Sequence, residues 1–460
     1  MGKKLYITLG SPPVNAVLMA AKAFNIHLDL HELDFSKQEN YSEWYLKINP
    51  TSTVPALDDE GFIVWDSHSI LVYLQEKYGK DTDLYPKDLK EKLKILQFLN
   101  FDCGMLFRRM GDCLRPIFYD DQKNFDPKTL ERAKSSYIIL ERILKQDKFV
   151  AGAYLSIADI SVFATMIAQN AFMPIDEQEF PCLKKWYSHL KSFDFYGAAL
   201  EGEVALKNGL RIKLELLIVI VNKKVPNYYW ESKSTFFTSQ KNMSSKPKLF
   251  YAQASPAARS TLLTIAALGL DVELIPVNLA AGEHLTPQFL KINPLHTVPT
   301  LQDGDLAVFD SHAINAYLVN KYGKNDSLYP KDAKKRAIVD QRLHFDSGIV
   351  FPRVGAVVGA LLRGGAKTIE KDKADLITQA YQSLEILLEG HNFIAGDELT
   401  IADFSLVATV SSSNAAIVPI ASNTYPRISA WLARLQALPY YETNQKGVDQ
   451  FKGMVLSKLA

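Results

Sequence analysis

Residues 292–301 read Ile-Asn-Pro-Leu-His-Thr-Val-Pro-Thr-Leu, and residues 48–57 read Ile-Asn-Pro-Thr-Ser-Thr-Val-Pro-Ala-Leu. The two stretches are 292 − 48 = 244 residues apart, and an Asp-Ser-His tripeptide follows each of them. The same offset relates matching residues along most of the chain: Leu5 and Leu249, Ser11 and Ser255, Gly152 and Gly396, Asp159 and Asp403. A constant offset over about 200 residues indicates that a whole unit is duplicated, since solenoid repeats are far shorter.

Both units share one hydrophobic pattern, which in the second predicts an α/β segment followed by helices. Strands are expected at 248–252, 272–277, 297–301 and 306–309, and helices at 260–268, at 286–291 and from 310 to the stop at Gly323. After residues 328–330 every long segment has helical periodicity. The predicted fold class is therefore α/β plus all-α, with a small α/β subdomain before a larger helical one.

The same pattern predicts the domain boundaries. We expect α/β subdomains at 1–80 and 244–324, and helical subdomains at 88–215 and 332–460. Residues 216–243 match neither unit and are interpreted as a linker, whose apolar run of six residues is far shorter than the roughly 20 that cross a membrane. An alternative is that two adjacent single-unit proteins have been joined at this segment. Native material would then show a species of about half the 51.6 kDa chain.

The composition excludes several classes of protein. Hydrophobic residues make up 47% and charged residues 22% of the chain, as in soluble globular proteins. With 52 basic and 51 acidic side chains, the net charge of +1 favours neither nucleic acid nor a membrane as partner. The three cysteines lack metal-type spacing, so we expect neither a disulfide framework nor a metal site. With no signal-peptide pattern at the start, a cytoplasmic location is expected.

Four motifs recur in the same order in both units: Ser-Pro, Asn-Pro-x-His/Ser-Thr-Val-Pro, Asp-Ser-His and Ser/Thr-Ile-Ala-Asp. In this order they resemble the cytosolic glutathione transferase family, and most closely the serine-using delta and epsilon classes of insects. Residues 281–287 and 344–348 resemble the epsilon class in particular. The resemblance covers both units. It implies that each has a thioredoxin-like N-terminal subdomain and an all-helical C-terminal subdomain.

The resemblance implies that a serine at the end of the first strand activates the thiol of glutathione. A free thiol has a pKa of about 8.5, so only a few per cent is ionised at pH 7 and the anion needs a hydrogen-bond donor. By position the donors are Ser255 and, in unit 1, Ser11. The spacing alone is also typical of a plain helix N-cap, because serine before proline is a common helix start.

The Val-Pro pairs are expected to face the peptide of glutathione. The resemblance implies a cis bond at Val298-Pro299 and at Val54-Pro55, which presents the valine backbone to the ligand like an added strand. For an isolated Val-Pro, the alternative is a proline that merely begins an edge strand.

The Asp-Ser pairs Asp310-Ser311 and Asp66-Ser67 precede predicted helices, whose free N–H groups and dipole favour an anion. The resemblance implies that they bind the γ-glutamyl end of glutathione, and helix capping is the alternative. His312 and His68 follow, where the family often has arginine. We expect these histidines to be weaker anchors or to be neutral at pH 7.

Three positions differ between the units: His284, His296 and Arg259 of unit 2 are Asn40, Ser52 and Asn15 in unit 1. The resemblance places His284 and His296 near the glycyl carboxylate and the cysteinyl backbone of glutathione. Losing a charge-assisted contact typically costs about 1.5–3 kcal/mol, so unit 1 is expected to bind glutathione roughly tenfold to hundredfold more weakly.

Two further sets of residues receive an interpretation. The segments Ser156–Asp159 and Thr400–Asp403 match helix capping boxes, for which the structural interpretation is preferred. The pocket for the second substrate is expected on the helix after Tyr329-Pro330 and on the C-terminal segment, with Phe345, Phe351 and Arg353 as its lining.

The expected function is attack of glutathione thiolate on a small hydrophobic electrophile, by substitution, conjugate addition or dehydrochlorination, as in detoxification. Glutathione is then a co-substrate, and no metal or organic cofactor is expected. The alternative is a non-catalytic glutathione- or hydrophobic-ligand-binding or assembly module. Family members are dimers, so the units are expected to pair with each other as an intrachain pseudo-dimer or with a second chain as a homodimer.

Overall fold

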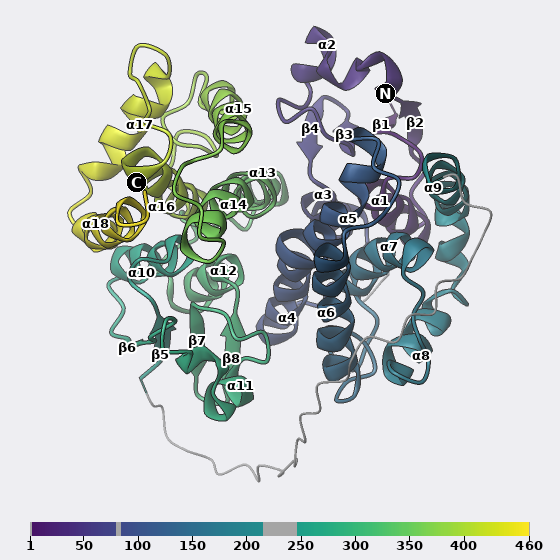
Figure 1. Cartoon of the computed structure of the whole chain (residues 1–460), viewed down its shortest axis with the longest axis horizontal. Helices are drawn as coiled ribbons and strands as arrows, with labels where there is room; N and C mark the ends of the chain where they lie inside the picture. Colours follow the sequence, from purple (N-terminus) through teal and green to yellow (C-terminus); the bar gives the residue numbers. More distant parts are fainter. Residues whose placement is uncertain (1, 80–83, 215–245, 460) are drawn as a thin grey trace.

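The computed structural model describes residues 2–79, 84–214 and 246–459, and the predicted linker at 216–243 lies outside them. Unit 1 occupies one side of the molecule and unit 2 the other (Figure 1). Each unit consists of a four-stranded sheet with flanking helices, followed by a bundle of helices. The predicted fold class is confirmed in both units.

The sheet of unit 1 combines a parallel βαβ unit with a hairpin. Its strands are β1 (Lys3–Ile7), β2 (Asp29–Glu32), β3 (Ala56–Asp59) and β4 (Phe62–Trp65), in the order β2-β1-β3-β4. The pair β1 and β2 is parallel across helix α1 (Pro12–Ala23), and the other two pairs are antiparallel. A short helix, α2 (Glu43–Leu46), precedes β3, and α3 (Ser67–Tyr78) follows β4.

Unit 2 repeats this sheet in the order β6-β5-β7-β8. The elements are β5 (Lys248–Tyr251), α10 (Pro256–Leu268), β6 (Glu273–Pro276), α11 (Pro287–Ile292), β7 (Thr300–Asp303), β8 (Leu306–Phe309) and α12 (Ser311–Tyr322). Helix α10 begins earlier than predicted because Ser255 is its N-cap and a proline occupies the first turn. Strand β7 begins later than predicted, directly after the turn at Val298-Pro299.

The helical subdomains follow the same order in the two units. Unit 1 has α4 (Leu89–Phe101), η3 (Asp102–Leu106), α5 (Phe107–Tyr119), α6 (Pro127–Leu144), α7 (Ile157–Phe172), α8 (Pro181–Leu190) and α9 (Leu200–Lys213). Unit 2 has α13 (Ala333–Phe345), η6 (Asp346–Val350), α14 (Phe351–Leu362), α15 (Lys371–Leu387), α16 (Ile401–Ala416), α17 (Pro426–Gln436) and α18 (Glu442–Leu456).

Helices α7 and α16 are the buried centres of the two bundles, and the predicted capping boxes begin both of them. Asp159 accepts hydrogen bonds from the backbone N–H groups of Ser156 and Val150 and from the indole of Trp186. Asp403 does the same in unit 2. Each carboxylate therefore joins the helix start to a neighbouring loop and to a tryptophan of the following helix, which confirms the structural interpretation.

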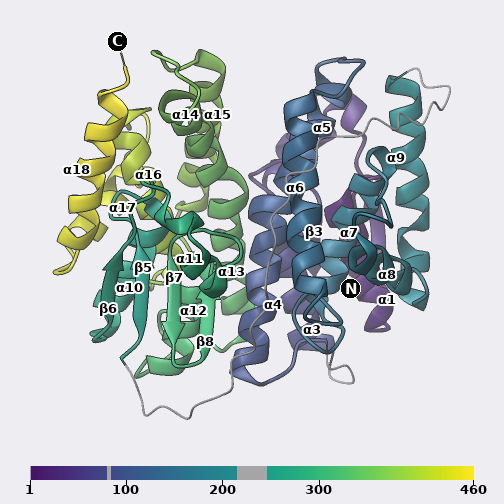
Figure 2. The same cartoon turned by 60° about the horizontal axis from the view of Figure 1, so that its bottom comes forward.

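The two units pack against each other reciprocally. Helix α3 of unit 1 contacts α13 of unit 2, and α12 of unit 2 contacts α4 of unit 1, so each sheet subdomain contacts the other unit's helical bundle. Figure 2 shows α4 and α13 running between the two halves. The contact is apolar at Trp65 and Phe345, whose rings meet edge to face with centroids 6.3 Å apart. It is polar where the Gln341 side chain donates to the backbone oxygen of Trp65 and where Arg336 pairs with Glu76.

One continuous helical segment among the described residues, Ala333–Leu362, is long and apolar enough to span a membrane by length and composition. It consists of α13, η6 and α14 and carries buried polar residues, Arg336, Asp340 and Arg342 among them. Core helices of soluble proteins pass the same test, so the segment is weak evidence for a membrane.

Candidate functional site

The sheet topology brings the predicted binding segments of unit 2 to one edge. Thr300 at the start of β7 pairs with Phe250 near the end of β5 and with Phe309 at the end of β8. The segments that follow β5, precede β7 and follow β8 therefore meet at this edge. They carry Ser255, Val298-Pro299 and Asp310-Ser311. Unit 1 has the same arrangement, because Ala56 pairs with both Tyr6 and Trp65.

Ser255 combines the two roles that the sequence left open. It is the N-cap of α10, and its Oγ accepts a hydrogen bond from the backbone N–H of Ala258 at 3.4 Å. This bond uses a lone pair of the oxygen, so the hydroxyl proton is free to be donated to a ligand. Its counterpart Ser11 caps α1 without a side-chain hydrogen bond. Both serines are partly exposed at the edge of their sheets.

The turn before β7 has the predicted form. The Val298-Pro299 bond is cis, and so is Val54-Pro55 in unit 1. Both expectations are confirmed. The side chain of Asn293 holds the loop before the turn by donating to the backbone oxygen of Thr297, as Asn49 does to Thr53.

The two histidines that distinguish unit 2 lie next to each other. The ring centroids of His284 and His296 are 6.2 Å apart, and Nδ1 of His284 is buried with no hydrogen-bond partner in the part of the chain that the structure describes. Partial desolvation, followed by the neighbouring His284, holds the pKa of His296 below its ordinary value. Because its ring is neutral in the absence of a ligand, His296 is suited to donate a hydrogen bond to an incoming carboxylate.

Unit 1 contributes positive charge to this site, which the sequence did not indicate. The guanidinium groups of Arg109 on α5 and Arg142 on α6 also lower the pKa of His296, although both belong to the other unit. In the opposite direction, Arg353 of unit 2 interacts electrostatically with Tyr41 of unit 1. The position equivalent to Arg142 is Ile386, so unit 1 lacks the second charge. The offset of 244 residues relates Arg109 to Arg353 and Arg142 to Ile386, but it does not predict that a residue of one unit lies beside the site of the other.

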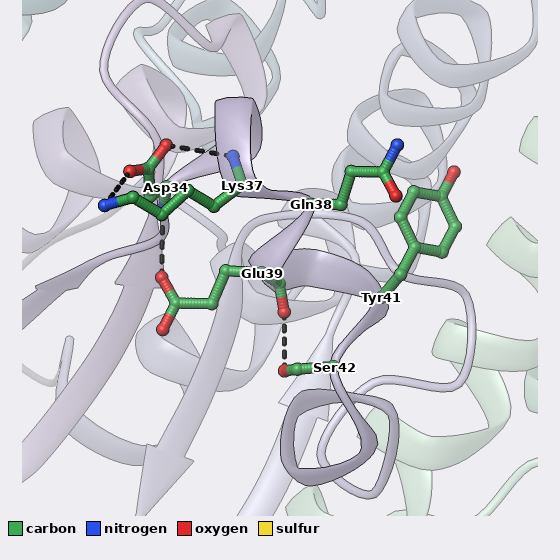
Figure 3. A pocket seen from close by; sticks show the side chains of 6 residues that line it. All are labelled: Asp34, Lys37, Gln38, Glu39, Tyr41 and Ser42. Atoms are coloured by element: carbon green, nitrogen blue, oxygen red, sulfur yellow. Dashed lines mark hydrogen bonds and ion pairs between the residues drawn. The ribbon is translucent and has the colours of Figure 1, made fainter.

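In unit 1 the equivalent positions are bonded to each other. The amide of Asn40 donates to the backbone oxygen of Ser52 at 3.0 Å, and Asn40 is buried. A hollow of about 530 Å³ opens beside this loop, and its lining is polar: Asp34, Lys37, Gln38, Glu39, Tyr41 and Ser42 (Figure 3). Ser11 is not part of this lining, so the hollow is separate from the predicted thiol donor of unit 1.

Asp310 and Asp66 are helix caps with an unusual backbone. Each has a positive φ, 72° and 71°, which is uncommon for a residue with a side chain. The carboxylate of Asp310 accepts from the backbone N–H groups of His312 and Ala313, and Asp66 accepts from those of His68 and Ser69. Such outliers cluster at functional sites. These hydrogen bonds establish both aspartates as helix caps. Ser311 and Ser67 lie buried beside them at the first helical position.

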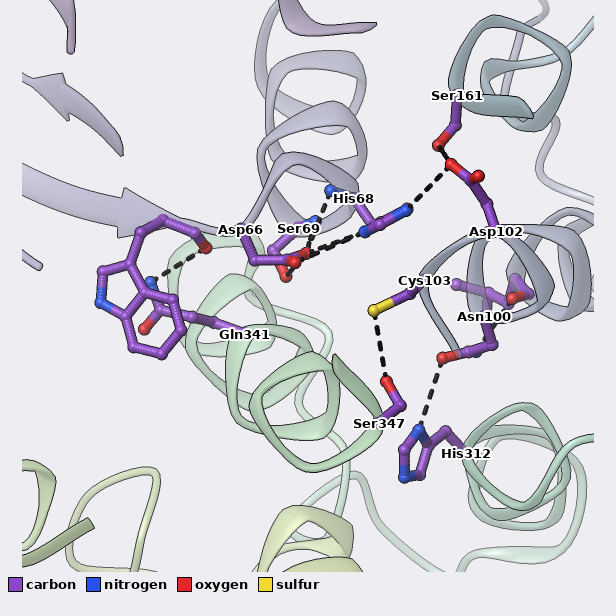
Figure 4. A network of polar contacts seen from close by, with 12 residues as sticks. Asp66, His68, Ser69, Asn100, Asp102, Cys103, Ser161, His312, Gln341 and Ser347 are labelled. Atoms are coloured by element: carbon purple, nitrogen blue, oxygen red, sulfur yellow. Dashed lines mark hydrogen bonds and ion pairs between the residues drawn. The ribbon is translucent and has the colours of Figure 1, made fainter. Parts of the chain in front are cut away.

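His68 and His312 are bonded inside the protein. His68 lies between Asp66 and Asp102, with Nε2 3.2 Å from Asp102, and Ser161 also donates to Asp102 (Figure 4). Burial alone would lower the pKa of His68, but the charge of Asp66 and the hydrogen bond to Asp102 raise it well above its ordinary value. The pKa of His312 is raised too, against burial, by its contact with Asp346. The raised pKa values favour charged rings over the neutral rings expected, and internal carboxylates hold both histidines.

Arg259 does not have the role that its loss in unit 1 suggested. The residue is fully buried, and its guanidinium donates to Asn444, Ser412 and the backbone oxygen of Ala408. A Cβ atom at Gly447 would lie 2.2 Å from Cδ of Arg259, so this glycine makes room for the side chain. Arg259 thus joins α10 to α16 and α18, and its replacement by Asn15 says nothing about glutathione affinity.

The residues expected to line the electrophile pocket are dispersed. Phe345 is 1% exposed and packs against Trp65 of unit 1, so it belongs to the contact between the units. Phe351 is 37% exposed on α14. Arg353 donates to the backbone oxygen of Leu376, and burial lowers its pKa to about 10. Of the three residues, Phe351 alone presents an open apolar surface.

Comparisons with known proteins match the same two domains in both units. Residues 1–76 and 245–320 match the family model of the glutathione S-transferase N-terminal domain, and residues 109–193 and 352–439 match that of the C-terminal domain. Glutathione S-transferase 1 of Manduca sexta is 48% identical over 214 residues, which span 46% of this chain and 98% of that protein. The chain belongs to the glutathione S-transferase family.

Other glutathione S-transferases are similar over the same share of the chain. Glutathione S-transferase D7 of Anopheles gambiae is 41% identical over 217 residues, 46% of this chain and 98% of that protein. An epsilon-class glutathione S-transferase from the housefly Musca domestica has a solved structure with 46% identity and a TM-score of 0.46, covering 46% of this chain and 98% of its own. The Manduca sexta and Anopheles gambiae proteins each match nearly their whole length to less than half of this chain, as a tandem of two complete units requires.

Proposed function

We propose that unit 2 catalyses the attack of glutathione thiolate on a small hydrophobic electrophile. The observation that carries the proposal is the partly exposed Ser255 at the sheet edge that also holds the Val298-Pro299 turn; its Oγ accepts the helix-cap bond, which leaves the hydroxyl as a donor. Donated to the sulfur of bound glutathione, this hydrogen bond favours the thiolate over the thiol. The thiolate then forms a bond to an electrophilic carbon while the leaving group departs with its electron pair.

The remaining residues of the edge orient glutathione. His284 and His296 are assigned to its glycyl carboxylate and cysteinyl backbone, with Arg109 and Arg142 of unit 1 adding positive potential. The backbone of Val298 pairs with the ligand peptide, and Asp310 with Ser311 holds the γ-glutamyl end. Holding both reactants close together supplies most of the remaining rate enhancement in such a bimolecular reaction.

Unit 1 is proposed to be the weaker site. It retains Ser11, Val54-Pro55, Asp66 and Ser67, but it has Asn40 and Ser52 in place of the two histidines, and the Asn40 amide is bonded to the backbone oxygen of Ser52. A binding or assembly role is the second candidate for this unit. Its support is the reciprocal packing of the sheet subdomains on the opposite bundles, through which unit 1 completes the surroundings of the unit 2 site.

The direct test is steady-state conjugation of glutathione to a chloronitrobenzene by the full chain. The absorbance of the thioether product measures the rate. Turnover that saturates with glutathione is expected. A chain that binds glutathione in calorimetry but forms no conjugate with this or other electrophiles would instead be a ligand-binding module.

A further inference from the structure

Three side chains of metal-ligating type meet where the two units touch. His68 and Cys103 come from unit 1 and His344 from unit 2, and one ligand atom of each lies within 4.8 Å of the other two. All three residues are buried, with exposed fractions of 4%, 6% and 5%. They lie on α3, η3 and α13, the elements that form the contact between the units.

Two buried atoms at this place have no hydrogen-bond partner among the described residues. They are Nδ1 of His344 and Oδ1 of Asp102. Buried polar atoms are nearly always bonded, and an unpartnered one at a cluster of ligands is a common trace of an ion or water. The second oxygen of Asp102 lies 3.2 Å from Nε2 of His68, and Asp66 lies 3.2 Å from Nδ1 (Figure 4). A carboxylate behind one ring nitrogen is the usual support of a metal-binding histidine, so His68 keeps one of these two contacts and gives up the other when it binds an ion.

We propose that His68, Cys103 and His344 bind one Zn²⁺ ion between the two units. One thiolate and two imidazoles suit zinc, whose bonds to sulfur and nitrogen are about 2.3 and 2.0–2.1 Å long. When the ion binds, the thiol proton passes to solvent, and each imidazole binds through an unprotonated nitrogen. The fourth position is available to a water molecule.

The histidine rings must move to bind the ion. They are stacked, with centroids 4.8 Å apart and planes at 30°, so their nitrogen lone pairs do not converge as they stand. One ring therefore turns out of the stack when the ion enters. His344 is the ring that turns most readily, since its Nδ1 has no hydrogen bond to lose.

The symmetric half of the interface lacks this ligand set. The positions equivalent to 68, 103 and 344 are 68 + 244 = 312, 103 + 244 = 347 and 344 − 244 = 100, which are His312, Ser347 and Asn100. There His312 lies 3.4 Å from Oδ1 of Asn100, and Ser347 lies 3.5 Å from Sγ of Cys103 (Figure 4). Serine and asparagine are not zinc ligands of structural sites.

The site therefore depends on which units pair. Two copies of unit 1 would lack His344, and two copies of unit 2 would lack Cys103. Only unit 1 against unit 2 assembles all three ligands. Because the ligands come from both units, the bound ion stabilises their docking by mass action.

The test uses the full chain, produced in medium containing Zn²⁺ so that the metal is present before the units close over the site. One zinc per chain is expected by elemental mass spectrometry after gel filtration. Replacement by Co²⁺ is expected to give a thiolate-to-cobalt charge-transfer band and the visible bands of a tetrahedral ion. These readouts need no variant and do not depend on glutathione chemistry.

Variants locate the ion. Cys103→Ser and His344→Asn are each expected to weaken metal binding by at least about 100-fold, whereas the matched control Cys182→Ser, in α8 away from the interface, retains one ion per chain. Circular dichroism checks that each variant is folded. An unmodified chain without zinc, a cobalt spectrum without the thiolate band, or a folded Cys103→Ser variant that keeps its ion would overturn the proposal.

Discussion

Ser52 and His296 have the same left-handed backbone, with φ values of 56° and 47°, at equivalent positions of the two units. The loop is thus conserved in shape while its side chain differs. Histidine adopts this conformation more readily than most residues, and serine already adopts it in unit 1, so exchange of the two side chains need not distort the loop. The two units therefore offer a matched pair in which one side chain can be tested.

Exchanging these side chains should shift glutathione affinity between the units. His296→Ser in the full chain is expected to weaken binding at unit 2 by about tenfold to hundredfold, because a charge-assisted contact to glutathione is lost. Calorimetry with glutathione measures the change. The exposed His391→Ser in the same unit is the control. The double change Asn40→His with Ser52→His should strengthen binding at unit 1, and an unchanged affinity in both variants would remove these positions from the site.

The contact between Arg336 and Glu76, 260 positions apart, belongs to an interface that should hold within one chain. Sedimentation at low concentration is expected to give a particle of 51.6 kDa. An assembly of twice that mass would mean that each unit pairs with a second chain. In either case Phe345→Ala should lower stability by about 3–5 kcal/mol, since a buried ring that packs on Trp65 is removed.

The capping carboxylate of α7 should be far more important for stability than an ordinary cap. Asp159→Ala removes the acceptor of hydrogen bonds from Ser156, Val150 and Trp186, and we expect a loss of about 2–4 kcal/mol in denaturant unfolding. Asp126→Ala, at the exposed start of α6, is the control and should cost about 1 kcal/mol. Equal losses at the two positions would show that the links to the loop and to the tryptophan contribute nothing.

Asp340 should make the stability of the chain depend on pH. Burial raises the pKa of this carboxyl from 3.8 to about 7, with one oxygen accepting from Tyr329 and the other without a partner. The folded chain thus binds the proton more tightly than the unfolded chain. This contribution is complete below pH 3.8 and is lost as the pH rises through 7.

Asp340→Asn removes this ionisation and keeps the volume of the side chain. The variant is expected to gain stability over the unmodified chain as the pH rises from 5 to 8, by up to about 3 kcal/mol, since about two units of the shifted range lie in this window. The exposed Asp332→Asn, in the N-cap of the same helix, controls for a change of one charge. A difference that does not vary with pH would contradict the raised pKa.

Local sequence patterns predict much of the fold because residues close together in the sequence specify most of the strands and helices. Strand β8 was predicted at its observed bounds, and both Val-Pro bonds are cis as the resemblance implied. The apolar periodicity predicts a helix start at residue 260, whereas α10 begins at Pro256. The periodicity becomes visible only about one turn after the Ser255 cap.

Local sequence patterns do not predict which residues of the two units come into contact. Cysteine spacing predicted no metal site, yet folding brings Cys103 next to His344, 344 − 103 = 241 residues later. The structural role of Arg259 also depends on residues distant in sequence, since its partners Ser412 and Asn444 lie on later helices of unit 2. Arg109 and Arg142 could not be assigned to the unit 2 site from the sequence, since they come from the other unit.

The thiol donor of unit 2 is the central assignment, and the most direct measurement compares Ser255→Ala with Ser11→Ala in the full chain. Initial rates of chloronitrobenzene conjugation at saturating glutathione are recorded across pH 6–9. Ser255→Ala is expected to lower turnover by about 100-fold and to raise the apparent pKa of bound glutathione, while Ser11→Ala leaves most of the turnover. Equal losses from the two variants, or an unchanged rate and pH profile in Ser255→Ala, would contradict a catalytic site at Ser255.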